Sequence, residues 1–296
     1  MQKDNTIIIS DNQNSLLAKK ISFELHTEYR NAEVRVFADG ESKIRLDNVA
    51  RRSCIIIHST YPPTDRHLMQ LFMMIYKCRQ DGAKDICIVC PYLAYSRQDK
   101  VFVEGEIITI NLIAEILAKL GTTRLITIDN HNPSALNYSF ETIDLTAIPT
   151  LATYIKKNIK LNDPIVISPD EGGIQRAKKF ARIINANMLS LVKKRDRFTG
   201  DISISFSEQQ SLNNRDALIV DDMISTGASI IKATELLKKN NIANVYVICT
   251  HALLLDGAKE KLLKTGIKEI ISTNSIPNEF AKVDLSGIIS NYFSDQ

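Results

Sequence analysis

Short apolar runs rich in β-branched residues alternate with longer amphipathic stretches from one end of the chain to the other. A short run of this kind indicates a buried strand, whereas apolar residues three and four apart indicate a helix that covers it. The alternation predicts a parallel α/β architecture. The expected strands are residues 6–10, 54–59, 85–90, 124–129, 164–168, 188–192, 217–222, 245–250 and 269–273. The expected helices are residues 15–26, 65–79, 107–120, 173–184, 227–239 and 256–264.

The same order of elements occurs in both halves of the chain, which predicts two similar domains, each a mainly parallel sheet flanked by helices. With 296 residues, the chain is long enough for each domain to bury its own core. Pro149 and the polar segment before it favour a boundary near residue 145. We therefore expect domains at residues 1–145 and 146–296.

The composition argues against several classes of partner. Lys and Arg total 37 against 34 Asp and Glu, and this net charge of +3 without a basic, aromatic stripe does not indicate nucleic-acid binding. No apolar run approaches the roughly 18 residues of a membrane span, and the first residues do not resemble a signal peptide. The five cysteines lie in apolar contexts, which suits reduced core thiols. We expect a cytoplasmic protein without a membrane partner.

The most specific segment is residues 218–229, where an apolar run ends in Asp221 and Asp222. A run of small and hydroxyl residues then opens a helical pattern, and consists of Ser225, Thr226, Gly227, Ala228 and Ser229. Carboxylates can accept hydrogen bonds from a sugar diol, and free N–H groups at a helix start can hold a phosphate. The segment is therefore suited to ribose 5-phosphate. The alternative is an ordinary turn in which these side chains only cap the helix.

Polar residues that follow other expected strands extend this site, because ligands collect at the carboxyl ends of parallel strands. Arg97 offers a planar guanidinium suited to phosphate, and Gln98 can read a purine edge or a ribose. His131 can bind a metal or a phosphate, although a lone histidine is more often a structural hydrogen-bonding group. Asp170 is an oxygen ligand suited to Mg²⁺.

Two further segments have both a plain and a functional interpretation. Lys193 and Arg195 belong to a basic cluster, which is usually solvated surface, but beyond a strand end it can be a flap that brings positive charge to a transferring group. Near the N-terminus, residues 37–41 place an aromatic ring beside two carboxylates around a glycine. The plain interpretation of that segment is a hairpin turn.

Taken in order, these segments resemble the ribose-phosphate pyrophosphokinase family over nearly the whole chain, and residues 218–229 also resemble the ribosyl-binding loop of type I phosphoribosyltransferases. The resemblance implies transfer of the β,γ-diphosphoryl group of ATP to the C1 hydroxyl of ribose 5-phosphate, with Mg²⁺ at His131 and Asp170. It implies catalytic roles for Lys193 and Arg195. It also implies a dimer-based homo-oligomer in which residues 37–41 reach the ATP site of a neighbouring subunit.

The resemblance assigns the remaining site residues as well. ATP binding is implied for Phe37, Asp39, Gly40, Glu41, Arg97, Gln98 and His131. Binding of ribose 5-phosphate is implied for Arg195, Asp221, Asp222, Ser225, Thr226, Gly227, Ala228 and Ser229.

Two alternatives use the same fold. A phosphoribosyltransferase would consume phosphoribosyl diphosphate with a base, but the ATP-type segments at residues 37–41 and 97–98 argue against it. A non-catalytic regulatory homologue would bind a partner enzyme, but retention of Lys193, Arg195, His131 and Asp170 argues against it. The chain departs from the family at Asn130, where leucine is common, and at Ala228, where glycine is common.

Overall fold

The computed structural model describes residues 5–135, 138–195, 202–207 and 210–295, with the backbone alone at 193–195 and 202–204. The chain forms two compact units. The first comprises Met1–Thr146, Ser275–Pro277 and Asp284–Gln296, and the second comprises Ala147–Asn274 and Asn278–Val283. The chain passes from the first unit to the second between residues 146 and 147, next to the expected boundary. The last residues return to the first unit, so residues 146–296 do not form one continuous unit.

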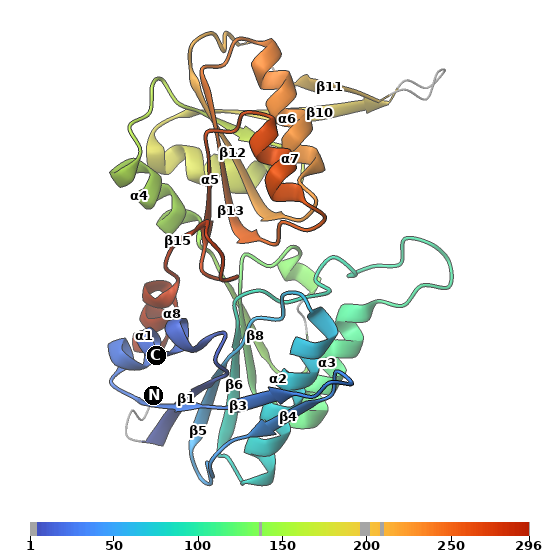
Figure 1. Ribbon diagram of the computed structural model, residues 1–296, viewed down its shortest axis with the longest axis vertical. Helices are drawn as coiled ribbons and strands as arrows, with labels where there is room; N and C mark the ends of the chain where they lie inside the picture. Colours follow the sequence, from blue (N-terminus) through green and yellow to red (C-terminus); the bar gives the residue numbers. More distant parts are fainter. Residues whose placement is uncertain (1–4, 136–137, 196–201, 208–209, 296) are drawn as a thin grey trace. The chain divides into compact units, whose positions relative to one another are not determined.

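The first unit is built on a six-stranded parallel sheet with the order β2-β1-β5-β6-β7-β8 (Figure 1). Its strands are β1 (Thr6–Ser10), β2 (Glu28–Asn31), β5 (Ser53–Ile57), β6 (Asp85–Cys90), β7 (Arg124–Ile128) and β8 (Glu141–Leu145). A separate antiparallel hairpin consists of β3 (Glu33–Val36) and β4 (Ser42–Arg45). The helices are α1 (Ser15–Leu25), α2 (Thr64–Gln80), α3 (Thr109–Leu120), the short 3₁₀ turn η2 (Pro133–Ala135) and α8 (Ser286–Ser294).

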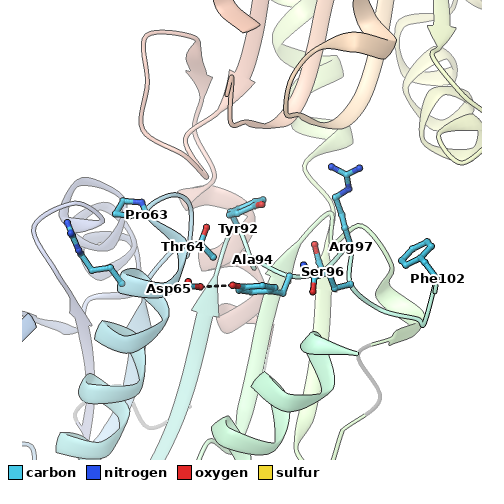
Figure 2. Close-up of a pocket in the computed structure, with 11 residues that line it drawn as sticks. Pro63, Thr64, Asp65, Tyr92, Ala94, Ser96, Arg97 and Phe102 are labelled. Carbon is cyan, nitrogen blue, oxygen red and sulfur yellow. Dashed lines mark hydrogen bonds between the residues drawn. The ribbon is translucent and has the colours of Figure 1, made fainter. Parts of the chain in front are cut away.

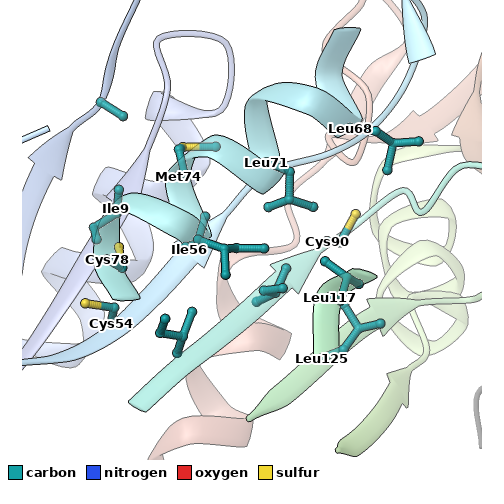
Figure 3. Close-up of a cluster of buried hydrophobic side chains, with 14 of the residues drawn as sticks. Ile9, Cys54, Ile56, Leu68, Leu71, Met74, Cys78, Cys90, Leu117 and Leu125 are labelled. Carbon is teal, nitrogen blue, oxygen red and sulfur yellow. The ribbon is translucent and has the colours of Figure 1, made fainter. Parts of the chain in front are cut away.

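Helices cover both faces of this sheet, α1 with α8 on one face and α2 with α3 on the other (Figure 1). Side chains of successive strand residues point to opposite faces, so a strand covered on both sides must be apolar at every position. All five residues of β1 are buried accordingly. Ile56 of β5 packs in one apolar cluster with Leu71 and Met74 of α2 (Figure 3).

The C-terminal helix is tied to the first unit by polar contacts as well. The Ser286 hydroxyl donates a hydrogen bond to the Glu24 carboxylate at 2.9 Å, and Lys20 pairs with Asp284. These contacts connect α1 to the start of α8, which explains why residues after 283 belong to the first unit. Their side chains are polar and far apart in the sequence, so the apolar pattern did not predict the pairing.

The second unit is built on a seven-stranded sheet with the order β11-β10-β9-β12-β13-β14-β15 (Figure 1). Its strands are β9 (Ile165–Ser168), β10 (Asn187–Arg195), β11 (Ile202–Phe206), β12 (Asp216–Ile224), β13 (Asn244–Ala252), β14 (Glu269–Thr273) and β15 (Ala281–Val283). Its helices are α4 (Ile148–Asn158), α5 (Ile174–Ile184), α6 (Ala228–Lys239) and α7 (Ala258–Lys264). All strand pairs are parallel except β10 with β11, which form an antiparallel ribbon.

The expected α/β class with parallel sheets and covering helices is confirmed. The apolar pattern did not predict several elements, namely β2, β3, β4, β8, β11, β15, α4 and α8, although a hairpin around residues 37–41 was the plain interpretation of that turn. Strand β10 also runs on to Arg195 instead of ending at residue 192, because Lys193 and Arg195 pair with Ile204 and Ile202 of β11. None of the described helices has the length and apolar character needed to cross a membrane.

The buried side of α2 should contribute strongly to stability. Leu71 is 0% exposed, whereas Leu16 on α1 is 79% exposed. We predict that Leu71→Ala lowers the free energy of unfolding by about 2–5 kcal/mol, because it leaves a cavity in a packed core. Leu16→Ala removes the same atoms from a solvated position and should change it by less than about 0.5 kcal/mol. Urea unfolding of the two variants checks this, and equal effects would contradict the assignment of the core face.

Candidate active site

Two adjacent carboxylates stand near the end of β12 in the second unit. Asp221 and Asp222 lie within this strand rather than after it, because β12 continues alongside β13 to Ile224. Arg176, in the first turn of α5, places Nη1 3.3 Å from Asp221 Oδ1 and Nη2 3.4 Å from Asp222 Oδ2. Burial raises the pKa of Asp221 well above its usual range, and the charge of Asp222 adds to this, while Arg176 opposes it.

The turn that follows presents a cluster of hydrogen-bond donors. Helix α6 begins at Ala228, and no side chain caps it, so the capping alternative for Ser225 and Thr226 is not observed. Within the described chain, the N–H groups of residues 225–229 and the hydroxyls of Ser225, Thr226 and Ser229 donate to no protein acceptor. Free donors at a helix N-terminus favour an anion, and a phosphate fits them.

Gly227 allows this turn for two physical reasons. Its φ of 75° lies in the left-handed region, which side chains disfavour. A Cβ at this position would also lie 3.1–3.2 Å from three side-chain atoms of Leu262 on α7. The glycine therefore lets the turn bend into α6 while α7 packs closely beneath it.

A second tight turn follows β9. The Ser168 hydroxyl donates to the Asp170 carbonyl at 2.7 Å, and Asp170 Oδ1 accepts a hydrogen bond from the Gly173 N–H at 3.0 Å. A Cβ on Gly173 would lie 2.7 Å from the Ser168 Oγ, so this position needs glycine. Among the described residues Asp170 Oδ2 has no hydrogen-bond donor, so this oxygen is available to a ligand.

The first unit contains a cavity of about 720 Å³ at the N-terminus of α2 and the loop after β6 (Figure 2). Its lining consists of Pro63, Thr64, Asp65, Arg66, Tyr92, Ala94, Tyr95, Ser96, Arg97, Gln98 and Phe102. The Arg97 guanidinium is exposed and has no protein partner in the described chain. The Gln98 amide oxygen accepts a hydrogen bond from the Thr109 hydroxyl at 2.6 Å.

Hydrogen bonds fix the shape of this cavity. The Tyr95 hydroxyl donates to Asp65 (Figure 2), and this bond raises the pKa of Tyr95, with a further contribution from burial. The Thr60 hydroxyl accepts the N–H of Ala94 at 2.8 Å, so the loop after β6 is anchored to the end of β5. The cavity walls are therefore preorganised.

His131 lies in the neighbouring loop after β7 and is exposed. The side-chain amide of Asn132 donates to Asp99, which connects this loop to the loop that carries Arg97 and Gln98. Asp144 on β8 accepts hydrogen bonds from the Thr127 hydroxyl at 2.6 Å and the Asn130 N–H at 2.9 Å. These contacts bring the two loops together at one edge of the sheet.

Residues 37–41 form the turn of the β3–β4 hairpin, as the plain interpretation predicted. The Phe37 N–H donates to the Glu41 carbonyl at 2.8 Å, and Asp39 Oδ1 accepts the Glu41 N–H at 3.1 Å. Gly40 has a φ of 93°. None of Phe37, Asp39, Gly40 and Glu41 is among the residues that line the cavity.

The basic cluster is described only in part. Lys193 and Arg195 belong to β10 by their backbone, while their side chains, and residues 196–201, lie outside the described part of the structure. The expected loop is therefore a strand where it can be described.

Comparison with known proteins gives a consistent result. The model of the N-terminal domain of ribose phosphate pyrophosphokinase matches residues 6–121, and that of the phosphoribosyl synthetase-associated domain matches residues 210–291. A ribose-phosphate pyrophosphokinase of Sulfurisphaera tokodaii is 36% identical over 279 residues, which cover 94% of this chain and 95% of the relative. One of Staphylococcus aureus is 34% identical over 294 residues, covering 96% and 91%.

A solved structure agrees with these relatives. The crystal structure of phosphoribosylpyrophosphate synthetase from Mycobacterium smegmatis has a TM-score of 0.86 and 25% sequence identity, and the match covers 98% of this chain and 100% of that chain. The chain belongs to the ribose-phosphate pyrophosphokinase family. It is an enzyme of the ribose-phosphate pyrophosphokinase type, as the sequence predicted.

Sequence reasoning missed several residues that shape the sites of this family member. Arg176 was not assigned a role. Its place in the first turn of the expected helix, just after Gly172 and Gly173, could have indicated that it lies at the site. Asp65, Tyr95 and Phe102 line the cavity without having been singled out. No group of three or more His, Cys, Asp or Glu side chains suited to a metal occurs among the described residues.

The contact at Gly173 gives a prediction. Its φ of −82° suits any residue, so only the Ser168 Oγ opposes a side chain there. Gly173→Ala should lower the free energy of unfolding by about 1–3 kcal/mol through overpacking. Adding Ser168→Ala should recover part of this loss, and a double-mutant cycle by urea unfolding measures the coupling. Gly287→Ala, with nothing within 4 Å of the added Cβ, is the control. Purely additive effects would contradict the contact.

Proposed function

We propose that this chain transfers the β,γ-diphosphoryl group of ATP to the C1 hydroxyl of ribose 5-phosphate, giving phosphoribosyl diphosphate and AMP. The observation that carries the proposal is the segment after Val220, where two carboxylates precede a turn of unpartnered N–H and hydroxyl donors. Carboxylates suit the sugar hydroxyls, and the donors suit the 5-phosphate. Asp221 and Asp222 with residues 225–229 therefore form the ribose 5-phosphate site in this proposal.

The cavity of the first unit supplies the features expected of an ATP site. Arg97 is a cation without an acidic partner among the described residues, and Gln98 adds an amide beside it, both on a loop held by hydrogen bonds. His131 lies on the adjoining loop. We assign these three residues to ATP binding.

Mg²⁺ is proposed as the cofactor. Asp170 fits this ion, because one carboxylate oxygen is committed to the Gly173 N–H and the other is available. Mg²⁺ prefers oxygen ligands and usually combines one or two protein groups with substrate phosphates. His131 is proposed as the second protein ligand. The ion would neutralise phosphate charge during transfer.

The proposed reaction needs alignment and charge neutralisation and no covalent enzyme intermediate. The C1 hydroxyl oxygen bonds to the β-phosphorus of ATP, the bond from that phosphorus to the bridging oxygen breaks, and AMP departs with the bonding electrons. The hydroxyl proton passes to solvent. Asp221 orients the sugar, and residues 225–229 hold its phosphate. Lys193 and Arg195 stabilise the negative charge on the diphosphoryl group during its transfer, and Arg195 also contacts ribose 5-phosphate.

We further propose a dimer-based homo-oligomer in the cytoplasm. In support, the hairpin turn carrying Phe37, Asp39, Gly40 and Glu41 does not line the cavity of its own chain, as expected if it serves a neighbouring subunit. The five cysteines are free and buried, which suits a reducing compartment.

The direct test is to incubate the purified chain with ATP, Mg²⁺ and ribose 5-phosphate. We expect AMP and phosphoribosyl diphosphate in equal amounts, and neither product when ribose 5-phosphate is omitted. A phosphoribosyltransferase would instead consume phosphoribosyl diphosphate with a purine or pyrimidine base and release diphosphate. Absence of AMP from a folded chain would refute the proposal.

The basic residues Lys193 and Arg195 give a second prediction. Cations that act on the transferring group should stabilise the transition state more than the bound substrates. Lys193→Ala and Arg195→Ala should each lower kcat roughly a hundredfold with a smaller change in KM for ATP, because such a contact contributes about 3 kcal/mol. Lys194→Ala should remain active, because the family resemblance gives this lysine no role in the site. Steady-state kinetics check this, and near-normal turnover of both single variants would remove the catalytic assignment.

A further inference from the structure

Arg176 joins the two carboxylates of the ribose site through a single planar group. Its side chain is 18% exposed, and its two terminal nitrogens lie 3.3 Å from Asp221 Oδ1 and 3.4 Å from Asp222 Oδ2. Only arginine presents two donors in a rigid fork, since lysine has one compact charge. The guanidinium, carried by α5, thus sets the orientation of two side chains carried by β12.

The hydrogen bonds and ion pairs of Asp221 and Asp222 use three of their four carboxylate oxygens and leave Asp221 Oδ2 without a donor among the described residues. Asp222 uses Oδ1 to accept the Met223 N–H at 2.9 Å and directs Oδ2 toward Arg176. Asp221 uses Oδ1 for both the Asp222 N–H, at 2.9 Å, and Arg176. In the described chain Asp221 Oδ2 has no protein donor. The Asp221 side chain is also the more exposed, at 15% against 6%.

The surroundings of Asp221 favour its neutral form. Burial raises the pKa of Asp221 most, and the charges of Asp222 on the same strand and Asp170 after β9 add to this effect. The Cys249 thiol on β13 is neutral, because burial raises its pKa as well. Arg176 is the cation that pairs with Asp221 among the described residues. An ionised carboxylate only accepts hydrogen bonds, whereas a protonated one also donates, so the two forms would present different groups to a sugar hydroxyl.

We propose that Arg176 is a positioning residue for the sugar, which holds the Asp221 side chain turned so that Oδ2 faces a hydroxyl of ribose 5-phosphate. The inference rests on the proposed function, because it assigns the ribose site to these carboxylates. Arg176 acts through Asp221 and does not itself touch the sugar. A purely structural link between α5 and β12 would affect stability alone and would leave the pH dependence of sugar binding unchanged.

The test measures the affinity for ribose 5-phosphate between pH 5 and 9 by calorimetry. The protein is first saturated with Mg²⁺ and α,β-methylene-ATP, whose α–β linkage cannot be cleaved, so that no turnover is needed. Removing the guanidinium raises the pKa of Asp221, and binding then requires a higher pH. Arg176→Gln should therefore move the acidic limb of the affinity profile upward by about one pH unit and weaken binding about tenfold near neutral pH.

Three further variants make the result specific. Arg176→Lys keeps the charge and loses the fork, so its acidic limb should stay near that of the wild type while affinity falls severalfold. Thr226→Ala should weaken binding at every pH without moving the limb, because it removes a phosphate donor. Arg182→Gln, an exposed arginine on the same helix, should bind as the wild type does. The substrate phosphate titrates equally in all variants and cancels in the comparison.

The outcomes separate the two proposals. An unmoved acidic limb in folded Arg176→Gln would overturn the positioning role, as would a limb in Arg176→Lys that moves as far as in Arg176→Gln. If Arg176→Gln fails to fold, the lysine variant alone decides, since an unchanged affinity there would overturn the need for a fork. Wild-type protein that binds ribose 5-phosphate but forms no AMP from ATP would refute the proposed reaction and leave the positioning role standing. Wild-type protein that binds no ribose 5-phosphate would overturn both.

Discussion

Burial of parallel strands on both faces is the constraint on which both units depend. Strands such as β1 and β9 have no exposed residue, so helices must cover each side of the sheet. Returns such as β5 to β6 through α2 and β12 to β13 through α6 cross through a helix. Because these neighbouring strands are parallel, their carboxyl ends come to one edge of the sheet. Polar side chains gather at this edge because it is the part of the strand-and-helix framework that is open to solvent.

Close packing at that edge limits which residues can occupy it. Gly173 sits where a Cβ would meet the Ser168 hydroxyl, and Gly227 sits where it would meet Leu262. Both glycines therefore let the backbone turn while a neighbouring element stays packed against it. Position 228, by contrast, is exposed and carries alanine where the family commonly has glycine. The methyl group of Ala228 therefore has space.

The sequence predicted the framework because buried strands and amphipathic helices leave a strong apolar pattern. Every strand and helix expected from that pattern is present, with shifts of a few residues at the ends. The elements it missed have a weak pattern. Strands β2, β3 and β4 are short and half exposed, and α8 joins the first unit through contacts with α1 that span more than 260 residues of sequence. Such long-range pairing has no local signal.

The sequence likewise indicated the site residues that have a local signal and missed those that depend on contacts between distant segments. Residues 97–98, 131, 170 and 221–229 were singled out because each lies at or beyond the expected end of a strand and carries a chemically distinctive side chain. Arg176 was missed as a partner of Asp221 because the pairing depends on how α5 packs against β12, which no spacing in the sequence reveals. The hairpin at residues 37–41 was recognised as a turn, but the turn chemistry alone could not say which cavity it serves.

Residues 221–229 are also where the chain departs from rules that favour stability. Two carboxyl groups stand side by side on a largely buried strand, and α6 begins without a side-chain cap. A cap typically contributes about 1 kcal/mol. Burial and the charge of Asp222 raise the pKa of Asp221, because a second negative charge is unfavourable at this place. Arg176 offsets part of the repulsion, but nothing in the described chain satisfies the donors of residues 225–229. A bound sugar phosphate would make both sets of missing contacts. Its hydroxyls would donate hydrogen bonds to the carboxylates, and its phosphate would accept hydrogen bonds from the N–H groups at the start of α6. Ligand binding at this segment is therefore favourable, because the ligand makes hydrogen bonds with donors that the described chain leaves without an acceptor.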